Sequence, residues 1–245
     1  LKLEKPMEVL FEGADTNIYK KTNDIPQALV DELSPIKEDF NFLFVGHWLK
    51  GTMGQDRKDV GMLVKVFLES FKGLDNPPGL ILKTSGAKFS IMDRNEMLSK
   101  VKQIKATVDS DKLPPIYVLH GDLSDEEING LYNHPKVKAH ISLTKGEGFG
   151  RPLLEASLSQ KPVIASAWSG HVDFLDKDLS VLVPGNLTEI HESAQWDDII
   201  MKEAKWFTAD YGFVANVMKD LYMNYRKYTA GGVSQGIKNK SAFSL

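Results

Sequence analysis

Short apolar runs alternate with longer amphipathic segments along most of the chain. Six of these runs are largely apolar and only a few residues long, a pattern typical of strands in a parallel sheet that is buried on both faces. We therefore predict a strand at each of them. They are residues 42–45, 80–82, 116–119, 137–143, 163–165 and 181–183.

The segments between these runs have the periodicity of amphipathic helices. Apolar residues recur on one helical face within residues 60–71 and again within residues 97–108. Ser124 opens a third helical segment, and Glu127 follows it at the spacing of a capping box. Alternating strands and helices predict an α/β fold with an open, doubly wound, Rossmann-like parallel sheet. In such sheets ligands bind at the carboxyl ends of the strands.

The same pattern divides the chain into four parts. Residues 1–39 precede the first convincing strand and form a lead-in, and residues 40–190 form the Rossmann-like domain. Large apolar residues recur along residues 191–230 at helical spacing, so we predict C-terminal helices there. The tail, residues 231–245, is rich in Gly, Ser and Lys, and we predict that it is loosely ordered.

Composition excludes several classes of protein. The formal net charge of the 245 residues is −3, so the chain lacks the basic excess of nucleic-acid-binding proteins. No run approaches the roughly 18 apolar residues of a transmembrane helix, and the first residues lack the apolar core of a signal peptide. Because there is no cysteine, disulfides and thiolate metal sites are excluded. We expect a cytoplasmic protein with no transmembrane segment and no nucleic-acid partner.

One segment, from Gly146 to Glu155, has the residues of a phosphate-binding loop. Its three glycines allow the backbone to approach a ligand closely. Pro152 suits the first turn of a helix, so we predict that a helix begins near Arg151 and directs its free N–H groups at the loop. Such a helix start favours a phosphate. The spacing G-x-G-x-G, with Glu147 inside it, differs from the dinucleotide-binding fingerprint.

The two glutamates of this segment have two readings on their spacing alone. In one, Glu155 reaches back from the first turns of the helix to accept hydrogen bonds from a ribose diol, and Glu147 points toward sugar hydroxyls. In the other, a glycine turn simply leads into a helix whose early glutamate interacts favourably with the helix dipole.

The segment resembles the E-x7-E signature of retaining GT-B glycosyltransferases of the group 1 type, because Gly-Phe-Gly lies between Glu147 and Glu155. Other parts of the chain follow the pattern of the same family, from about residue 8 to about residue 225. They are residues 12–16, 44–46, 56–60, 154–156, 161–165, 169–171 and 182–184.

This resemblance implies that the chain is the nucleotide-sugar-binding half of a GT-B fold. It implies transfer of a sugar from a UDP-, GDP- or ADP-linked donor to an acceptor glycan or another hydroxyl acceptor, with retention of anomeric configuration. It implies no cofactor and no required metal. In that architecture the acceptor enters from an N-terminal domain, so residues 1–39 would be the linker from that domain, and this chain would bind donor without transferring it alone.

The resemblance also implies roles for individual residues. Glu155 would bind the ribose and Glu147 the transferred sugar, while Lys58 and Arg57 would neutralise the diphosphate. The donor-binding set would be completed by His47, Gly148, Phe149, Gly150 and Leu154.

The sequence departs from the family pattern around the loop that carries Arg57 and Lys58, which we call the basic loop. His47 stands where the family often has arginine, and residues 49–55 lengthen the loop. The familiar R-K-G becomes R-K-D, with Asp59 in the place of the glycine. One phosphate contact therefore differs from the family, and the longer loop changes the approach of the acceptor.

Two other functions compete with this reading. A non-catalytic nucleotide- or sugar-binding module of the same fold would have the same pattern. A Rossmann oxidoreductase is disfavoured because no G-x-G-x-x-G follows the early strands. We interpret His120 and His171 as polar loop residues, because no cluster has metal-ligand spacing. Trp48 and Trp168 are either packed indoles or platforms for a sugar.

Overall fold

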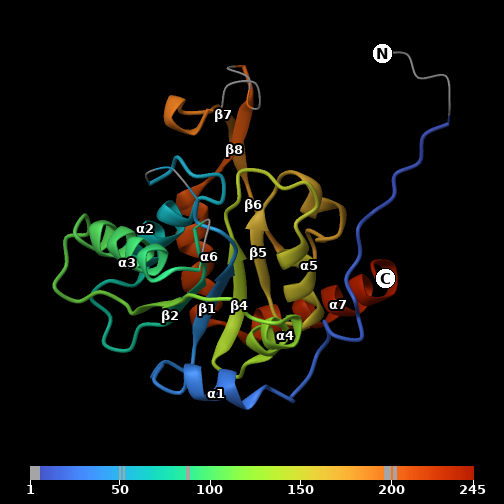
Figure 1. Ribbon diagram of the computed structural model, residues 1–245, viewed down its shortest axis with the longest axis horizontal. Coiled ribbons are helices and arrows are strands. Elements are labelled where there is room, and N and C mark those ends of the chain that lie inside the picture. The colour runs from blue at the N-terminus through green and yellow to red at the C-terminus, as the bar shows by residue number, and fades with distance from the viewer. Residues whose placement is uncertain (1–5, 50, 52, 87–88, 196–199, 201–202) are drawn as a thin grey trace.

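The computed structural model describes residues 6–49, 51, 53–86, 89–195, 200 and 203–245. At its centre a six-stranded sheet has the order β3-β2-β1-β4-β5-β6, and every neighbouring pair is parallel (Figure 1). Each predicted apolar run forms one strand, so that prediction is confirmed. The strands are β1 (Asn41–Val45), β2 (Gly79–Lys83), β3 (Ile116–Leu119), β4 (Val137–Ser142), β5 (Val163–Ser166) and β6 (Val181–Val183).

The strand order creates a switch point between β1 and β4. From β1 the chain adds β2 and then β3 on one side, and it returns to place β4 on the other side of β1. The loops that follow β1 and β4 therefore leave the sheet in opposite directions. A crevice at the carboxyl ends of the strands is expected at such a point.

Helices cover both faces of the sheet. The first face is covered by α2 (Val60–Phe71), α3 (Ile91–Lys105) and α6 (Tyr211–Met223), whose apolar residues share one buried cluster. The second face is covered by α1 (Gln27–Leu33), α4 (Asp125–Asn133) and α5 (Arg151–Leu158), which share another cluster. The predicted doubly wound, Rossmann-like α/β fold is confirmed.

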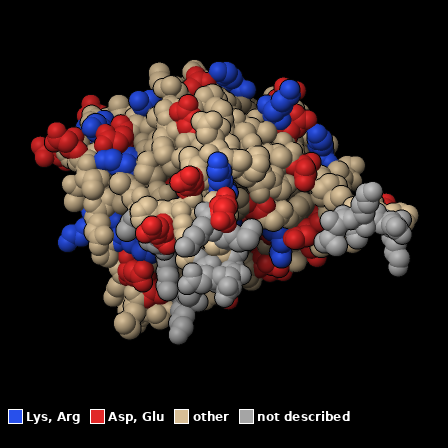
Figure 2. Space-filling view, turned by 90° about the horizontal axis from the view of Figure 1, so that it is seen from above, with Lys and Arg blue, Asp and Glu red and all other residues tan. Residues whose placement is uncertain are grey.

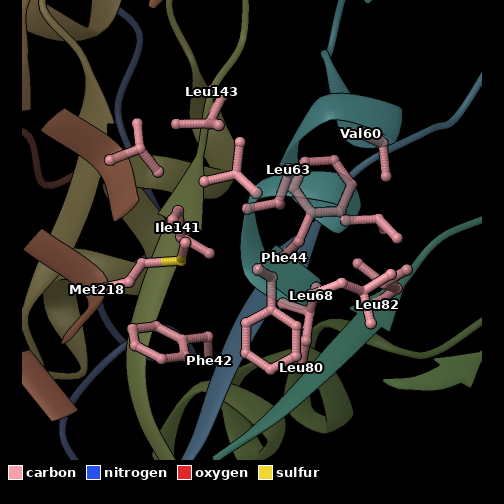
Figure 3. Packing of buried hydrophobic residues seen from close by; sticks show 14 of the residues in the cluster. Phe42, Phe44, Val60, Leu63, Leu68, Leu80, Leu82, Ile141, Leu143 and Met218 are labelled. Carbon is pink, nitrogen blue, oxygen red and sulfur yellow. The ribbon is translucent and has the colours of Figure 1, made fainter. Parts of the chain in front are cut away.

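The central strand β1 shows why continuous apolar runs were needed. Phe42 and Phe44 point into the first cluster, where Figure 3 shows them among Leu63, Leu80 and Met218 from neighbouring elements. Leu43, between them, points into the cluster on the opposite face. Successive side chains of a strand face opposite sides, so a strand covered on both faces needs apolar residues at every position.

The prediction of continuous helices in residues 191–230 is wrong in part. A strand, β8 (Lys205–Ala209), pairs antiparallel with β7 (Gly185–Glu189), and helix resumes only at α6. Phe207 and Ala209 are buried, whereas Trp206 and Thr208 are partly exposed, which is the two-residue period of a strand. Two 3-10 turns, η1 (Gly170–Asp173) and η2 (Glu192–Ala194), complete this region. The residues 196–199, which carried part of the predicted helical pattern, lie outside the described residues.

The prediction of a loosely ordered tail is also wrong. Residues 226–242 form a helix, α7 (Arg226–Ala242), that packs along α5. Its glycines allow the close approach, since a Cβ on Gly232 would lie 2.7 Å from the backbone of Lys161. Gln235 and Asn239 are buried and donate hydrogen bonds to the Phe174 carbonyl and the Ser157 hydroxyl, at 2.7 and 2.8 Å. Tertiary packing therefore orders a segment whose composition indicated disorder.

Within the described part of the chain, no helix combines the length and the apolar character needed to cross a bilayer.

The described part of the lead-in, residues 6–39, contains α1 and contacts the C-terminal end of the chain. Ala14 forms an isolated parallel bridge with Ser244, and its N–H donates to the Phe243 carbonyl at 2.9 Å.

Candidate functional site

A cavity of about 480 Å³ lies at the carboxyl edge of the sheet. It extends from the switch point between β1 and β4 to the end of β3, because residues from the loops after β1, β2 and β3 and from the start of α5 line it. Four residues of the predicted site line it together: His47, Arg57, Lys58 and Glu155. Residues that lie about a hundred positions apart in the sequence therefore meet in one crevice.

The basic loop before α2 is held in place by hydrogen bonds at the start of the helix and to the loop after β4. Asp59 precedes the helix in the left-handed region, with φ of 55°, and the carboxylate of Asp56 accepts the Val60 N–H at 3.2 Å. The Arg57 carbonyl accepts the Lys145 N–H at 2.8 Å, which ties this loop to the loop after β4. The two loops that flank the switch point are therefore joined directly.

A buried polar network lies beneath the basic loop. Asp59 is fully buried, its carboxylate accepts the Tyr211 hydroxyl at 2.6 Å, and the Lys145 ammonium lies 3.4 Å away. Burial raises the pKa of Asp59, and Lys145 opposes that shift. Burial also raises the pKa of Asp56 to about 6, and the nearby charge of Asp59 adds to the effect. Sequence reasoning missed this network because Asp59 and Tyr211 are 152 residues apart.

Residues 146–150 form the loop before α5, which we call the glycine loop. Within it, Glu147 joins the glycine loop to the basic loop. Its carboxylate accepts a hydrogen bond from the Lys58 ammonium, and the Arg57 guanidinium lies 3.3 Å from its other oxygen. Burial alone would raise the pKa of Glu147, but the adjacent Lys58 ammonium brings that pKa below its ordinary value. Burial lowers the pKa of Lys58, while Glu147 opposes the shift. Of the three predicted catalytic residues, Lys58 and Glu147 therefore form a largely buried ion pair beside the cavity, and the more exposed Arg57 lies next to it.

The glycine loop offers backbone donors at the predicted helix start. α5 begins at Arg151 with Pro152 in its first turn, as predicted, and Gly150 precedes it with φ of 96°. The N–H groups of residues 148–151 donate no hydrogen bond to any residue that the structure describes. Such donors at a helix start are suited to an anion.

Two residues of the predicted donor-binding set have side chains that lie behind this loop instead of in the cavity. Phe149 is buried, with its ring 5.0 Å from that of Phe174. Leu154 is fully buried in the core, and its N–H donates to the Gly150 carbonyl at 3.2 Å. We therefore reassign Leu154 from donor contact to support of the loop, because neither its side chain nor its N–H is available to a ligand.

The underside of the glycine loop rests on residues 169–171. The Ser169 hydroxyl accepts the Glu147 N–H at 2.9 Å, and the Gly170 N–H donates to the Glu147 carbonyl at 3.2 Å. A Cβ on Gly170 would lie 2.0 Å from the Gly148 carbonyl oxygen, so only glycine fits there. His171 is fully buried and donates to the Ser166 carbonyl at 2.6 Å, and burial lowers its pKa. It is thus a buried support, which corrects its interpretation as a polar loop residue.

The end of the cavity nearest α4 contains carboxylates. Glu155 is 6% exposed and lies 3.2 Å from the Arg151 guanidinium. Burial raises the pKa of Glu155, and Arg151 opposes the shift. Tyr19, from the lead-in, lines the same end, and its hydroxyl donates to Asp125 at 2.8 Å. Sequence reasoning assigned no role to Tyr19 or Asp125, since neither belongs to a recognisable motif.

Some of the remaining candidate residues lie at the cavity, and others are packed against neighbouring side chains away from it. His47 is exposed at the cavity, with its ring 3.2 Å from the Ser85 hydroxyl oxygen. Trp48 is a packed indole at 2% exposure, whereas Trp168 is 42% exposed and stacks on Phe207 with ring centroids 6.1 Å apart. His120 bonds to Asp93 at 2.7 Å. In the part of the chain that is described, no three His, Asp or Glu side chains are grouped so that they could hold a metal.

Acidic and basic side chains are interspersed on the face of the molecule seen in Figure 2. This mixture agrees with the net charge of −3 and gives that face no extended basic surface for nucleic acid. The positive charge that matters is local, at Arg57 and Lys58 inside the cavity.

Comparison with known proteins gives a family and a fold. Residues 63–202, more than half of the chain, match the family described as glycosyl transferases group 1. The C-terminal domain of a glycosyl transferase group 1 family protein, LpcC, from Francisella tularensis has 17% identity and a TM-score of 0.62, covering 94% of this chain and 97% of that domain. No curated protein sequence matches the chain.

Two longer structures contain the same fold. HepE from Anabaena, in complex with UDP and glucose, has 16% identity and a TM-score of 0.62, covering 97% of this chain and 53% of HepE. Sucrose-phosphate synthase from Thermosynechococcus elongatus has 16% identity and a TM-score of 0.61, covering 95% of this chain and 47% of the synthase. The chain therefore spans about half the length of these two proteins.

Proposed function

The chain belongs to the glycosyl transferases of group 1, and we propose that it provides the donor-binding half of a retaining glycosyltransferase. The donor is a sugar linked to UDP, GDP or ADP, and the acceptor is a glycan or another hydroxyl compound. HepE, which shares the fold, was solved with UDP and glucose, and this supports a nucleotide sugar as the ligand.

One observation carries the proposal. Arg57, Lys58 and the buried Glu155 line the cavity at the switch point together with Arg151, the first residue of α5. The N–H groups of Arg151 and of residues 148–150, which precede it directly, donate to no residue that the structure describes. Cations and free N–H groups at a helix start suit a diphosphate, and a carboxylate suits the two hydroxyls of a ribose. The diphosphate, the ribose and the transferred sugar of the donor thus each have a partner when Glu147 is assigned to the sugar.

These residues act on the leaving group. The bond between the anomeric carbon and the diphosphate oxygen breaks, the acceptor oxygen forms the new bond to the same carbon, and the acceptor proton is released. Negative charge grows on the diphosphate during this step. Arg57 and Lys58 belong to a loop that the buried network supports, and the backbone donors belong to a loop that rests on residues 169–171. Donors that are fixed in advance stabilise that charge with little rearrangement.

The proposal needs no metal, because the cations of the basic loop neutralise the diphosphate. Each charge-assisted hydrogen bond from such a group contributes on the order of 1.5–3 kcal/mol. His47, in the place where the family often has arginine, contributes a weaker phosphate contact, because an imidazole has fewer N–H donors than a guanidinium. Addition of EDTA should therefore leave donor binding unchanged, and a loss of binding on chelation would contradict this part of the proposal.

Calorimetric titration tests the proposed function. UDP, GDP and ADP should be compared with uridine, guanosine and adenosine. We expect at least one diphosphate to bind about tenfold or more tightly than its nucleoside, since the phosphates supply the charge-assisted contacts. Equal affinity within every pair that binds would contradict a diphosphate site. For the full-length protein, NMR of the first product formed reports whether the anomeric configuration is retained.

A further inference from the structure

Beyond the basic loop, the cavity has an acidic end where β3 stops and α4 begins. Asp122 and Asp125 line this end, and Leu123 and Ile128 give it apolar surface. In the order β3-β2-β1-β4 it lies two strands away from the switch point. If the phosphates lie at Lys58 and the ribose at Glu155, as the proposed function requires, the base of the nucleotide extends into this acidic end.

Asp125 is held in a fixed orientation by Tyr19. The Tyr19 hydroxyl donates to one carboxylate oxygen at 2.8 Å, and the other oxygen accepts no hydrogen bond from the residues that the structure describes. Tyr19 is 4% exposed. The backbone after it is clamped along α4, because the Lys20 N–H donates to the Asn129 side chain at 3.1 Å and the Thr22 N–H to that of Asn133 at 3.0 Å.

The carboxylates at this end of the cavity interact with nearby cations to different extents. Glu155 pairs with Arg151 at 3.2 Å, and Asp122 interacts electrostatically with Lys83. Asp125 forms no salt bridge within the described part of the chain, and Arg151 interacts with it only at longer range. Its second carboxylate oxygen is therefore placed to accept hydrogen bonds from a base.

The pairing edges of the common bases respond differently to such a carboxylate. Guanine presents two adjacent donors, N1–H and the exocyclic amine, which match the two oxygens of one carboxylate. Uracil presents one N–H between two carbonyl oxygens, and adenine presents an amine beside a ring acceptor, so in both a carboxylate faces at least one acceptor. We infer that this site selects guanine through Asp125, with Tyr19 as its positioning residue, and that the donor is a GDP-linked sugar. The inference rests on the proposed function.

Calorimetry with four diphosphates tests the assignment. We expect GDP to bind more tightly than UDP and ADP, and IDP, which lacks the exocyclic amine, to bind about tenfold more weakly than GDP. Asp125→Asn should weaken GDP about ten- to a hundred-fold, because an amide N–H2 then faces the base donors, and should leave UDP affinity nearly unchanged. Tyr19→Phe should reduce the ratio of GDP to IDP affinity without abolishing binding.

The matched control is Glu126→Gln. It removes the same charge from the same first turn of α4, but Glu126 does not line the cavity, so the affinity for GDP should not change. Tighter binding of UDP or ADP than of GDP would overturn the guanine assignment, and so would an equal loss for all nucleotides in Asp125→Asn. If a nucleotide binds in a Lys58-dependent way without preference for GDP, only this inference fails. If no nucleoside diphosphate binds, the proposed function fails with it.

Discussion

The Lys58–Glu147 ion pair couples the two halves of the proposed donor site. Lys58 is assigned to the diphosphate and Glu147 to the transferred sugar, yet their side chains are bonded to each other in the structure. Each is only slightly exposed, at 13% and 11% of its side chain. The charge on one therefore affects the ligand contacts of the other, and single substitutions at the two positions should have opposite effects on plain nucleotides.

Replacement of Lys58 by alanine should weaken nucleoside diphosphate binding about ten- to a hundred-fold, because a charge-assisted phosphate contact is lost. Lys72→Ala is the matched control, since Lys72 also pairs with a glutamate but lies outside the cavity. Titration calorimetry on both variants measures the effect. Parental affinity in Lys58→Ala would show that the basic loop has been misassigned.

The two glutamates should differ by ligand. Glu155→Gln should weaken a nucleotide and its sugar conjugate alike, about ten- to a hundred-fold, because the ribose contact is common to both. Glu147→Gln should weaken only the sugar conjugate, and it should bind the plain nucleotide as well as the parent or better, since Lys58 loses a competing carboxylate. Binding curves at matched folded fraction measure both. Identical losses for the two ligands in both variants would contradict the division of roles.

Residues of the site were predictable only where they belong to a motif. The glycine loop and its two glutamates are continuous in sequence, and Arg57 and Lys58 are adjacent to a helix start. Tyr19 and Tyr211 contact their aspartates across 106 and 152 residues, and no local pattern marks either contact. These partners depend on tertiary structure, which a single sequence does not show.

At the scale of elements, burial explains which predictions succeeded. All six strands of the parallel sheet were predicted from their short apolar runs, which burial in a parallel sheet favours, although β4 also contains Lys138, His140 and Ser142. The β7–β8 hairpin was missed because β7 is mostly exposed and has no such run. α7 was missed because its glycines, which disfavour a helix intrinsically, are needed for close packing on α5.

The packing of α7 gives a test by substitution. Gly232→Ala would normally favour a helix, but here its Cβ would lie 2.7 Å from the Lys161 backbone, so we expect destabilisation by about 1–3 kcal/mol. Ser234→Ala, on the exposed side of the same helix, should be neutral or slightly stabilising. Urea unfolding measures both. A gain in stability for Gly232→Ala would contradict the observed contact.

The contribution of the loop before α2 to the stability of the fold should depend on pH. Burial raises the pKa of Asp56 from 3.8 to about 6, so the folded state keeps this proton to a higher pH than the unfolded chain. Its stabilising contribution is therefore present below about pH 4 and lost as the pH rises to about 6. Asp56→Asn should match the parent near pH 4 and exceed it by about 2–3 kcal/mol at pH 7.

The measurement is urea unfolding of the parent and of Asp56→Asn between pH 4 and pH 7. Asparagine keeps an oxygen that can accept the Val60 N–H, so the helix start should survive the substitution. Asp111→Asn, at an exposed position, serves as the control and should show no such dependence. A stability difference that is the same at every pH would contradict the burial of an ionisable carboxyl at this position.

At the scale of the whole molecule, binding of the donor should stabilise the folded state. The proposed ligand touches the loops after β1, β3 and β4 at the same time, so binding should raise the melting temperature. At a concentration a hundred times the dissociation constant, the gain is about 2.7 kcal/mol. For a chain of this size that corresponds to roughly 5–10 °C. Differential scanning fluorimetry with the tightest diphosphate and its nucleoside, each at the same concentration, measures the difference.

The most direct test of the account is a crystal structure of the chain with a hydrolysis-resistant sugar nucleotide. The predicted result places the diphosphate within hydrogen-bond distance of the Lys58 ammonium and of the N–H groups of residues 148–151. It also places both ribose hydroxyls on the Glu155 carboxylate. A nucleotide bound outside this cavity, or bound in it with its ribose away from Glu155 and its phosphates away from Lys58, would contradict the proposed donor site.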